Sequence, residues 1–451
     1  MLRGLIISLL LAGPAQAQSG PTLSGQIDFG FRSYPEAGLF AGQSAAGTGF
    51  FIGAEVNGHL GLGDGDVTLQ FRALGDDRDG RSGLSLTKAH YTRVFDAWDL
   101  LVGYNVENWG VAESRSVLNV INPVDGTDLG FGQDQIGTPM INANFATSLG
   151  TISAYALVGF VQPKVPGRNT RARAPWPTFN SRAVFQEGNG RNLDVALRFS
   201  NNYTLGQGAV DIAASYFNGT SRTAVGLPGC GQPSALVPAV ACDTINAVVL
   251  EAYENGALAG TSSQAIIDQL AGRLDKATLR ALSSLPSVGF IPYYQKVQNF
   301  GLSAVYARGD LQLRVEGAYR KPKGENGSFA AVVGGDYSWS GFAGGDGTLT
   351  LAVEYLYDGR DARQPAAIFD NDMFLGLNFL MNDTRDTRLQ LGGFYDLDTH
   401  AQLYQFGLST RLNDHVRAEL SASHARTTGF NDPLAFLGDD TFIELKFSAY
   451  F

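Results

Sequence analysis

The chain ends with Thr441-Phe-Ile-Glu-Leu-Lys-Phe-Ser-Ala-Tyr-Phe451. Apolar and polar side chains alternate along this stretch, which is the period of a β-strand whose two faces meet different surroundings. One face carries Ile443, Leu445, Phe447 and Phe451, and the other carries Glu444, Lys446 and Ser448. We therefore predict that the chain ends in a strand with one apolar and one polar face.

The same alternation recurs along most of the chain, for example in residues 193–200, 311–320 and 348–358. These stretches are longer than the five or six residues that are typical of a strand in a globular protein. A tilted strand that crosses a bilayer needs about 9–11 residues. Long alternating strands therefore fit a sheet that has lipid on one side and water on the other.

Such stretches provide an even number of candidate strands, as a single-chain bacterial barrel requires. The candidates are 22–33, 49–60, 65–74, 84–95, 98–107, 140–149, 150–162, 190–202, 208–218, 298–308, 310–321, 329–341, 348–358, 370–381, 387–397, 400–412, 415–426 and 440–451. Every second connection is tight and rich in Gly, Asn or Asp, as turns are, and three others are long, at about 108–139, 163–189 and 219–297. The sequence predicts an all-β fold, a transmembrane antiparallel β-barrel of about 18 strands with periplasmic turns and long extracellular loops.

The composition agrees with a large β-protein. The chain has 451 residues, of which 56 are Gly, more than the usual share of about 7%. Charged residues make up 17%, which is too few for a disordered chain. The net charge of −10 argues against the broad basic face that nucleic acid needs. Two Cys exclude a disulfide scaffold and a Cys-rich zinc module.

The first 17 residues have the order of a secretory signal peptide. Arg3 precedes the apolar run Leu5–Ala12, and Ala15-Gln16-Ala17 supplies the small residues of a cleavage site. This run is far shorter than the roughly 20 residues that a helix needs to cross a bilayer. We expect cleavage after Ala17 and export of residues 18–451 as the barrel.

The terminal strand resembles that of Gram-negative outer-membrane barrels, which end in Phe and are recognised by the barrel-assembly machinery. The resemblance implies that Phe451 is an assembly signal and that the chain is a multi-pass protein of the outer membrane. Its surroundings would then be outer-membrane lipid and lipopolysaccharide. Ala449 departs from the pattern, because a bulkier apolar residue is common there, and Tyr450 supplies the aromatic ring one place later.

The first long loop carries the most individual sequence. Leu101–Glu113 reads Leu-Val-Gly-Tyr-Asn-Val-Glu-Asn-Trp-Gly-Val-Ala-Glu, and Val117–Asp125 reads Val-Leu-Asn-Val-Ile-Asn-Pro-Val-Asp. The order Asn122-Pro123-Val-Asp125 predicts a helix start, with Asn as the cap and Pro as the first helical residue. Trp109 has two interpretations: an anchor that packs the loop against the wall, which we favour, or a contact for a transported solute.

Here the chain resembles a large, mostly uncharacterised family of proteobacterial outer-membrane barrels, often encoded near resistance-nodulation-division exporters. That family carries Gly-Arg-Gln, Trp-Gly-Glu and Asn-Val-Ile-Asn-Pro-x-Asp, which match Gly103, Trp109, Gly110, Asn119, Asn122, Pro123 and Asp125. Two departures are Tyr104-Asn105 in place of Arg-Gln, and Val111-Ala112 before Glu113. The resemblance implies a barrel with a structured loop near the lumen and no enzymatic activity, and it raises an inner-membrane exporter as a candidate partner.

The second long loop is basic. Its cations are Lys164, Arg168, Arg171, Arg173, Arg182 and Arg191, and Glu187 is the single carboxylate among them. Such a loop either draws anionic solutes toward a pore or neutralises the phosphates of lipopolysaccharide.

In the third long loop, apolar residues recur at helical spacing over Ser262–Leu285, with Pro286 following. A helix here would constrict the lumen, cover the mouth or fold on the outside. Cys230 and Cys242 lie in the same loop, and we expect them to form a structural disulfide in an oxidising compartment.

Charged residues on the polar faces of the strands are the pore-lining candidates: Arg314, Glu316, Arg320, Arg388, Arg411, Arg417 and Glu419. The sequence lacks the common hydrolase, phosphate-loop, zinc and dinucleotide motifs. The acidic turn Gly75–Gly80 also lacks the spacing of a calcium loop. We therefore predict no enzyme, no cofactor, no metal and no nucleic-acid partner.

Together these patterns predict a porin-like channel for passive movement of small solutes, gated or narrowed by inward loops. Three alternatives stay open. The first is an outer-membrane component that exports a lipid or other hydrophobic molecule with an inner-membrane exporter. The others are an adhesin or structural barrel, and a barrel-embedded lipid hydrolase.

Overall fold

A computed structural model describes residues 20–78, 80–127, 134–235, 237–258, 284–285, 287–427, 432–437 and 441–451. The predicted signal peptide and nearly all of the predicted helix Ser262–Leu285 lie outside these residues. Within the described ranges, no helix has both the length and the apolar character that a membrane crossing requires.

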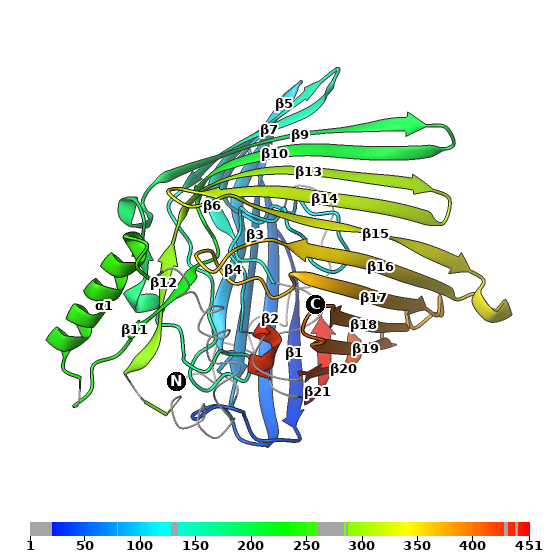
Figure 1. The fold of residues 1–451 in the computed structure, drawn as a ribbon. Coiled ribbons are helices and arrows are strands. Elements are labelled where there is room, and N and C mark those ends of the chain that lie inside the picture. Colours follow the sequence, from blue (N-terminus) through cyan, green and yellow to red (C-terminus); the bar gives the residue numbers. More distant parts are fainter. Residues whose placement is uncertain are drawn as a thin grey trace.

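Eighteen antiparallel strands form one closed sheet, which confirms the predicted fold class (Figure 1). The strands are β1 (Thr22–Tyr34), β2 (Gly47–Leu62), β3 (Gly65–Asp76), β4 (Gly83–Val94), β5 (Trp98–Asn105), β6 (Thr138–Thr147), β7 (Gly150–Val158), β9 (Leu193–Leu205), β10 (Gly208–Thr220), β13 (Lys296–Arg308), β14 (Leu311–Pro322), β15 (Ser328–Ser340), β16 (Thr348–Asp358), β17 (Asn371–Leu380), β18 (Arg388–Asp396), β19 (Gln402–Asn413), β20 (Val416–Arg426) and β21 (Thr441–Tyr450). Each strand pairs with the next along the barrel, and β1 pairs with both β2 and β21. The sheet therefore has no free edge, which removes the hazard of unpaired strands.

The connections alternate between short turns at one end of the barrel and longer loops at the other. Gly309 sits in the turn between β13 and β14 with φ 56°, and Gly63 in the turn between β2 and β3 with φ 61°. Glycine takes this left-handed conformation without strain, which is why such tight turns contain it. The longest connections at the other end join β5 to β6, β7 to β9, and β10 to β13.

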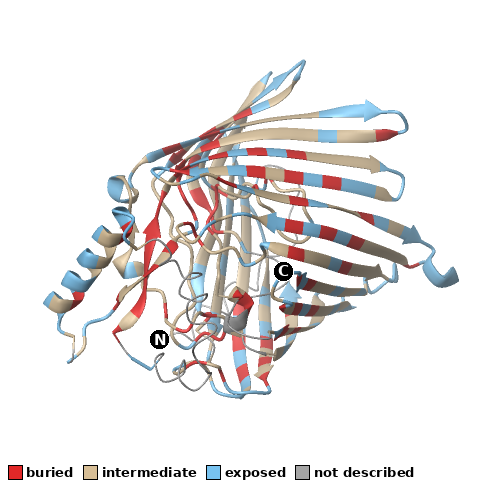
Figure 2. Cartoon of the chain, viewed as in Figure 1, coloured by how far each residue is buried: buried red, intermediate tan, exposed pale blue. Residues whose placement is uncertain are grey.

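The two faces of the wall differ as the alternation predicts. On β14, Leu313 and Val315 point outward and are 48% and 43% exposed, whereas Glu316 points inward and is fully buried. Figure 2 shows this alternation of exposed and buried residues as bands along the strands. An apolar outer face of this extent would be costly in water and is expected in lipid.

Aromatic side chains mark both edges of the outer apolar face. Phe329, near one end of β15, is 52% exposed, and Trp339, near the other end, is 41% exposed. Ten residues of a strand that tilts by about 40° rise by roughly 26 Å along the barrel axis. This matches the apolar band of about 25 Å between aromatic girdles in outer-membrane barrels.

The last residue of the chain completes the closure of the barrel. Phe451 and Gly25 exchange two backbone hydrogen bonds, each of 3.0 Å. A Cβ atom on Gly25 would lie 2.8 Å from the Phe451 ring, so the ring fits because Gly25 has no side chain. Phe451 thus joins the final strand to the first.

The loops carry a second, small sheet and one helix. Strands β8 (Val184–Phe185), β11 (Val225–Cys230) and β12 (Val288–Tyr294) pair with one another, and helix α1 (Ala239–Glu254) packs on β11. In Figure 1 these elements lie beyond the ends of the barrel strands, with α1 at the margin of the molecule. The structure also has short 3-10 helices, η1 (Asn180–Arg182), η2 (Gly188–Gly190), η3 (Phe342–Gly344) and η4 (Pro433–Leu437).

Candidate functional site

The connection between β5 and β6 turns into the barrel, and we call its residues 106–127 the inward loop. Trp109 is 3% exposed, and its ring centroid lies 5.6 Å from that of Tyr155 on β7. Leu118 and Ile121 join the same apolar cluster, which includes inward side chains of β5, β6, β7, β9, β10, β13 and β14. Trp109 therefore packs the loop against the wall, in line with the interpretation favoured from the sequence.

The two asparagines of the motif fix the path of the inward loop. The Asn119 Oδ1 atom accepts hydrogen bonds from the backbone N–H groups of Trp109 at 2.8 Å and Gly110 at 3.0 Å. Asn122 is 3% exposed; its amide donates to the carbonyls of Asn105 at 2.8 Å and Ile136 at 2.9 Å. These amides replace backbone pairing that an irregular loop cannot make for itself.

The predicted helix start at Asn122-Pro123-Val-Asp125 is wrong. Val124 and Asp125 instead form isolated β-bridges with Gln135 and Lys164. The side chain of Asn122 binds the start and end of its own loop rather than a helical turn. The carboxylate of Asp125 lies 2.9 Å from the Lys164 ammonium and also accepts from Thr127. Partners distant in the sequence thus outweighed the local capping pattern.

Two buried wall carboxylates hold the tip of the inward loop. Glu316 on β14 accepts the backbone N–H groups of Val111, Ala112 (2.8 Å) and Val117 (3.0 Å), and the Ser116 hydroxyl (2.7 Å). Glu354 on β16 accepts the N–H groups of Glu113 (2.8 Å) and Ser114 (2.9 Å) and the Ser114 hydroxyl (2.5 Å). Hydrogen bonds to ionised acceptors are stronger than those between neutral groups, so the loop tip is firmly fixed.

The motif glycine leaves room for this arrangement. A Cβ atom on Gly110 would lie 2.2 Å from the Ser116 hydroxyl oxygen and 3.2 Å from a Glu316 carboxylate oxygen. Any side chain at position 110 would therefore displace the loop tip from Glu316.

Arginines flank the loop tip on both sides. Arg314 on β14 forms ion pairs with Asp336 on β15 and, at 2.5 Å, with Glu113 of the loop. Arg115 lies on the loop itself, with its guanidinium 5.8 Å from the centre of the Phe369 ring. Burial lowers the pKa of Arg115 to about 10, because the charged form loses hydration there.

The inward loop reaches the opposite part of the wall as well. Ala112 and Val117 pack against a second apolar cluster, whose inward side chains come from β15, β16, β17, β18, β19 and β20. Because the loop contacts inward residues from β5 to β20, it crosses the interior of the barrel and narrows it.

The structure places the predicted pore-lining residues in three settings. Arg314 and Glu316 face inward but lie buried beneath the loop, so they position the loop instead of lining open water. Arg320 is also enclosed; its guanidinium donates to Ser221 and Gln295 at 3.2 Å. The remaining four, near the end with short turns, are Arg388, Arg411, Arg417 and Glu419.

Those four differ in their pairing. Arg388 and Arg411 are exposed, Arg417 pairs with Asp386, and Glu419 lies 2.7 Å from the Lys446 ammonium. The Glu419 and Lys446 side chains are 33% and 25% exposed. This pair therefore stays in contact with the lumen.

Glu354 and a second ion-pair network were not identified from the sequence. Asp194 on β9 is 1% exposed and lies 3.1 Å from Arg222 and 3.0 Å from Lys296. Arg222 also donates to the Ile121 carbonyl at 2.9 Å, so it connects the third long loop to the inward loop. One sequence signal could have identified these buried carboxylates: an acidic residue within an otherwise apolar strand, as at Glu354.

Arginine side chains of the basic second loop contact neighbouring parts of the protein. Arg171 donates to the carbonyls of Glu36 at 2.9 Å and Ser44 at 3.0 Å. Arg173 is 4% exposed, and burial lowers its pKa to about 10. Both arginines hold neighbouring loops together.

In the third long loop, a disulfide joins Cys230, the last residue of β11, to Cys242 in α1, with Cα atoms 5.1 Å apart. Tyr253 at the end of α1 donates to the Arg363 carbonyl at 2.6 Å, in the connection between β16 and β17. The described part of this loop therefore packs at the mouth of the barrel.

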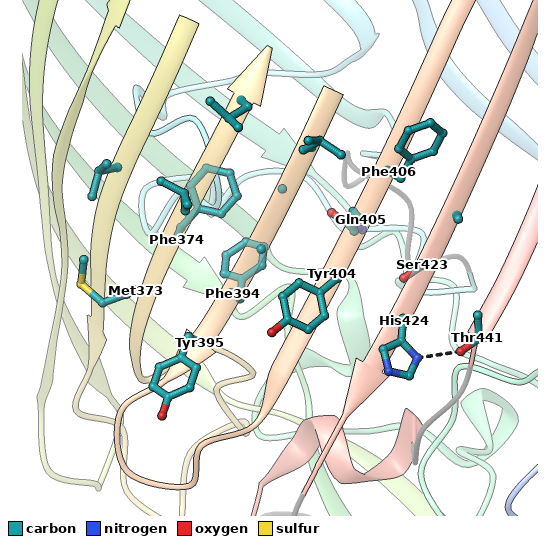
Figure 3. A pocket seen from close by; sticks show the side chains of 17 residues that line it. Met373, Phe374, Phe394, Tyr395, Tyr404, Gln405, Phe406, Ser423, His424 and Thr441 are labelled. Carbon is teal, nitrogen blue, oxygen red and sulfur yellow. Dashed lines mark hydrogen bonds between the residues drawn. The ribbon is translucent and has the colours of Figure 1, made fainter. Parts of the chain in front are cut away.

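A groove of about 710 Å³ lies along β17 to β21 (Figure 3). Most of its lining residues, such as Leu375, Tyr395 and Tyr404, belong to the outward apolar face. A hydrogen bond of 2.6 Å joins His424 to Thr441 at one end. The groove lies mainly on the outward face, so it is separate from the interior of the barrel.

A comparison with one solved structure supports the fold. A BenF-like porin from Pseudomonas fluorescens Pf-5 superposes with a TM-score of 0.50 at 8% identity, covering 96% of this chain and 98% of the porin. OccK5 (OpdH) of Pseudomonas aeruginosa gives a TM-score of 0.47 at 11% identity, covering 95% and 97%. A mutant of Rhodopseudomonas blastica porin gives 0.38 at 12% identity, covering 96% and 100%. The chain has the fold of a porin barrel.

No family model matches the chain. No curated protein matches it either. The family resemblance inferred from the Trp-Gly and Asn-Pro-x-Asp motif therefore stays a prediction, although the structure gives Trp109, Gly110, Asn119, Asn122 and Asp125 a physical role.

Proposed function

We propose that this protein is an outer-membrane channel for passive movement of small polar solutes, narrowed by its inward loop. The observation that carries the proposal is the clamping of that loop by Glu316 and Glu354 across the interior of the barrel. A barrel of 18 strands is wide enough for water and solutes unless loops occupy it. A fixed internal loop sets the width of the path, which is how a pore acquires selectivity.

The outward face supports a location in the outer membrane. Its apolar side chains and its two aromatic edges match a membrane-spanning barrel. The barrel-assembly machinery and lipopolysaccharide are the partners that this location implies.

The surroundings of the histidines favour a channel over a barrel-embedded hydrolase. A hydrolase of that kind needs a Ser–His pair. In the described part of the chain, the side-chain contacts of histidine are to the Tyr104 carbonyl, Asp66, Tyr395 and Thr441, and none is to a serine hydroxyl.

Planar-bilayer recording of the purified protein tests the proposal. We expect discrete single-channel steps that candidate polar solutes block from one side. A variant that lacks residues 111–117 should assemble and conduct severalfold more than the parent. If neither protein conducts, passive transport is wrong, and export of a hydrophobic molecule becomes the leading alternative.

A further inference from the structure

Four aspartates gather at the extracellular end of β17 and β18, away from the inward loop's carboxylate clamps. Asp372 on β17 lies directly opposite Asp396 on β18 in the strand register, and the two are 0% and 1% exposed. Asp370 precedes β17, and Asp432 precedes η4. Two neighbouring strands and two loop connections therefore bring carboxylates to one place.

The spacing of these carboxylates suits a metal ion. One carboxylate oxygen from each of Asp370, Asp372 and Asp396 lies within 4.8 Å of the other two. Oxygen ligands bind Ca²⁺ at about 2.3–2.6 Å, so two ligands on opposite sides of the ion are at most about 5 Å apart. Asp432 lies nearby, but both oxygens of its carboxylate already accept hydrogen bonds, from the Thr399 hydroxyl at 2.9 Å and from the Leu434 N–H group at 2.6 Å.

Two oxygen atoms in this cluster are buried and have no partner. The Asp372 Oδ1 and Asp396 Oδ2 atoms are inaccessible to solvent and accept no hydrogen bond in the structure. The other oxygen of Asp396 accepts the N–H groups of Asp398 (2.8 Å) and Thr399, which fixes the carboxylate. Buried polar atoms nearly always have a partner in folded proteins, so these two oxygens indicate a missing ligand.

The cluster also has no compensating positive charge. In the described residues, no Lys or Arg forms an ion pair with any of the four aspartates. Such a group of carboxylates is unfavourable unless a cation neutralises it.

We propose that Asp370, Asp372 and Asp396 form a structural calcium site at the mouth of the barrel. All donors are carboxylate oxygens, which suit hard cations and not Zn²⁺ or Cu²⁺. Mg²⁺ demands strict octahedral geometry and retains several waters. Two fully buried carboxylates leave little room for those waters, so the site favours Ca²⁺. Asp370 is exposed and leaves the ion a path from solvent.

The ion would connect the mouth to the inward loop. Leu434 of η4 packs in the same apolar cluster as Phe394 and Leu403, and Ala112 and Val117 of the inward loop pack against that cluster. By joining the end of the connection 359–370 to the facing ends of β17 and β18, calcium would fix the part of the mouth that packs near the tip of the inward loop. This inference does not require that the barrel conduct solutes.

The test uses full-length protein, refolded without lipopolysaccharide and stripped with chelator. Isothermal titration with CaCl₂ should show one ion per chain with a Kd in the micromolar to millimolar range, and MgCl₂ should bind at least tenfold more weakly. Tb³⁺ should bind at the same site, and Ca²⁺ should displace it.

Asp372→Asn and Asp396→Asn should each weaken calcium binding at least thirtyfold. Asp398→Asn is the matched control, because Asp398 is an exposed neighbour that accepts from Asn371 at 2.9 Å and lies outside the cluster; it should bind as the parent does. Asp370→Asn provides a second variant if a buried substitution prevents folding. Absence of stoichiometric binding by the parent, or equal affinity in parent and cluster variants, would overturn the proposal.

Discussion

The Glu354 carboxylate accepts the backbone N–H group of Ser114 at 2.9 Å, although the two residues are 240 positions apart in the sequence. Glu316 holds the neighbouring residues of the loop in the same way, from the next-but-one strand of the wall. Because both carboxylates are buried, each bond is shielded from competing water. The shape of the interior therefore depends on two glutamates of the wall.

Replacing both glutamates should free the loop tip. In Glu316→Gln with Glu354→Gln, each side chain keeps its shape but loses the charge that makes its hydrogen bonds strong, about 1.5–3 kcal/mol for a bond to a charged group. We expect single-channel conductance to rise severalfold and to fluctuate, as measured in planar bilayers.

Glu419→Gln is the matched control for that experiment. Glu419 is also an inward glutamate, but it pairs with Lys446 rather than with the inward loop. Loss of the Glu419 charge should change ion selectivity modestly and leave the open-channel noise as in the parent. Equal conductance of parent and double variant would show that the carboxylates do not set the width of the path.

Asn122→Leu should unfold the inward loop while the barrel remains closed. The leucine leaves the N–H group of Glu107 and the carbonyls of Asn105 and Ile136 without their present partners. Each buried unpaired group costs about 1–3 kcal/mol. Limited proteolysis should then cut within residues 106–127, whereas the heat-modifiable band on a gel should persist. Asn201→Leu, near the end with short turns, should leave the proteolysis pattern unchanged.

Deleting Phe451, or replacing it with Asp, should impair assembly. Phe451 exchanges two hydrogen bonds with Gly25 and completes the pairing between the last and first strands. We expect lower outer-membrane levels and loss of the faster-migrating unboiled band, whereas Phe451→Tyr should assemble normally. Wild-type levels of the Asp variant would refute the assembly role.

Strand order could be predicted because it depends on local information. The alternation along residues 311–320 reports directly which side chains face lipid, and turn residues such as Gly309 mark the ends of strands. The partners of the inward loop depend on distant residues instead, so the sequence indicated neither Glu354 nor the role of Asn122 as a clamp on Asn105 and Ile136. The same reason explains why the local pattern at Pro123 wrongly predicted a helix.

Helix α1 was missed for a related reason. Its first residue follows Pro238, and its apolar residues do not form a clear stripe: Val240 and Val248 are 79% and 59% exposed. Contacts made from its ends, such as that between Tyr253 and the Arg363 carbonyl, position it and leave no periodic pattern. The predicted helix over Ser262–Leu285 falls almost wholly outside the described residues and stays a prediction.

Removing the disulfide should separate the role of the third long loop from that of the inward loop. In Cys230→Ser with Cys242→Ser, the cross-link between β11 and α1 is lost, which destabilises a closed segment of this length by about 3 kcal/mol. The elements that it joins lie at the mouth, whereas the inward loop lies within the barrel. We therefore expect faster proteolysis between residues 231 and 258 from the outer side. Assembly should be normal, and the conductance should differ from that of the parent by no more than about 10%. A severalfold rise in conductance, equal to that of the Glu316→Gln and Glu354→Gln double variant, would instead show that the third loop controls the path through the barrel.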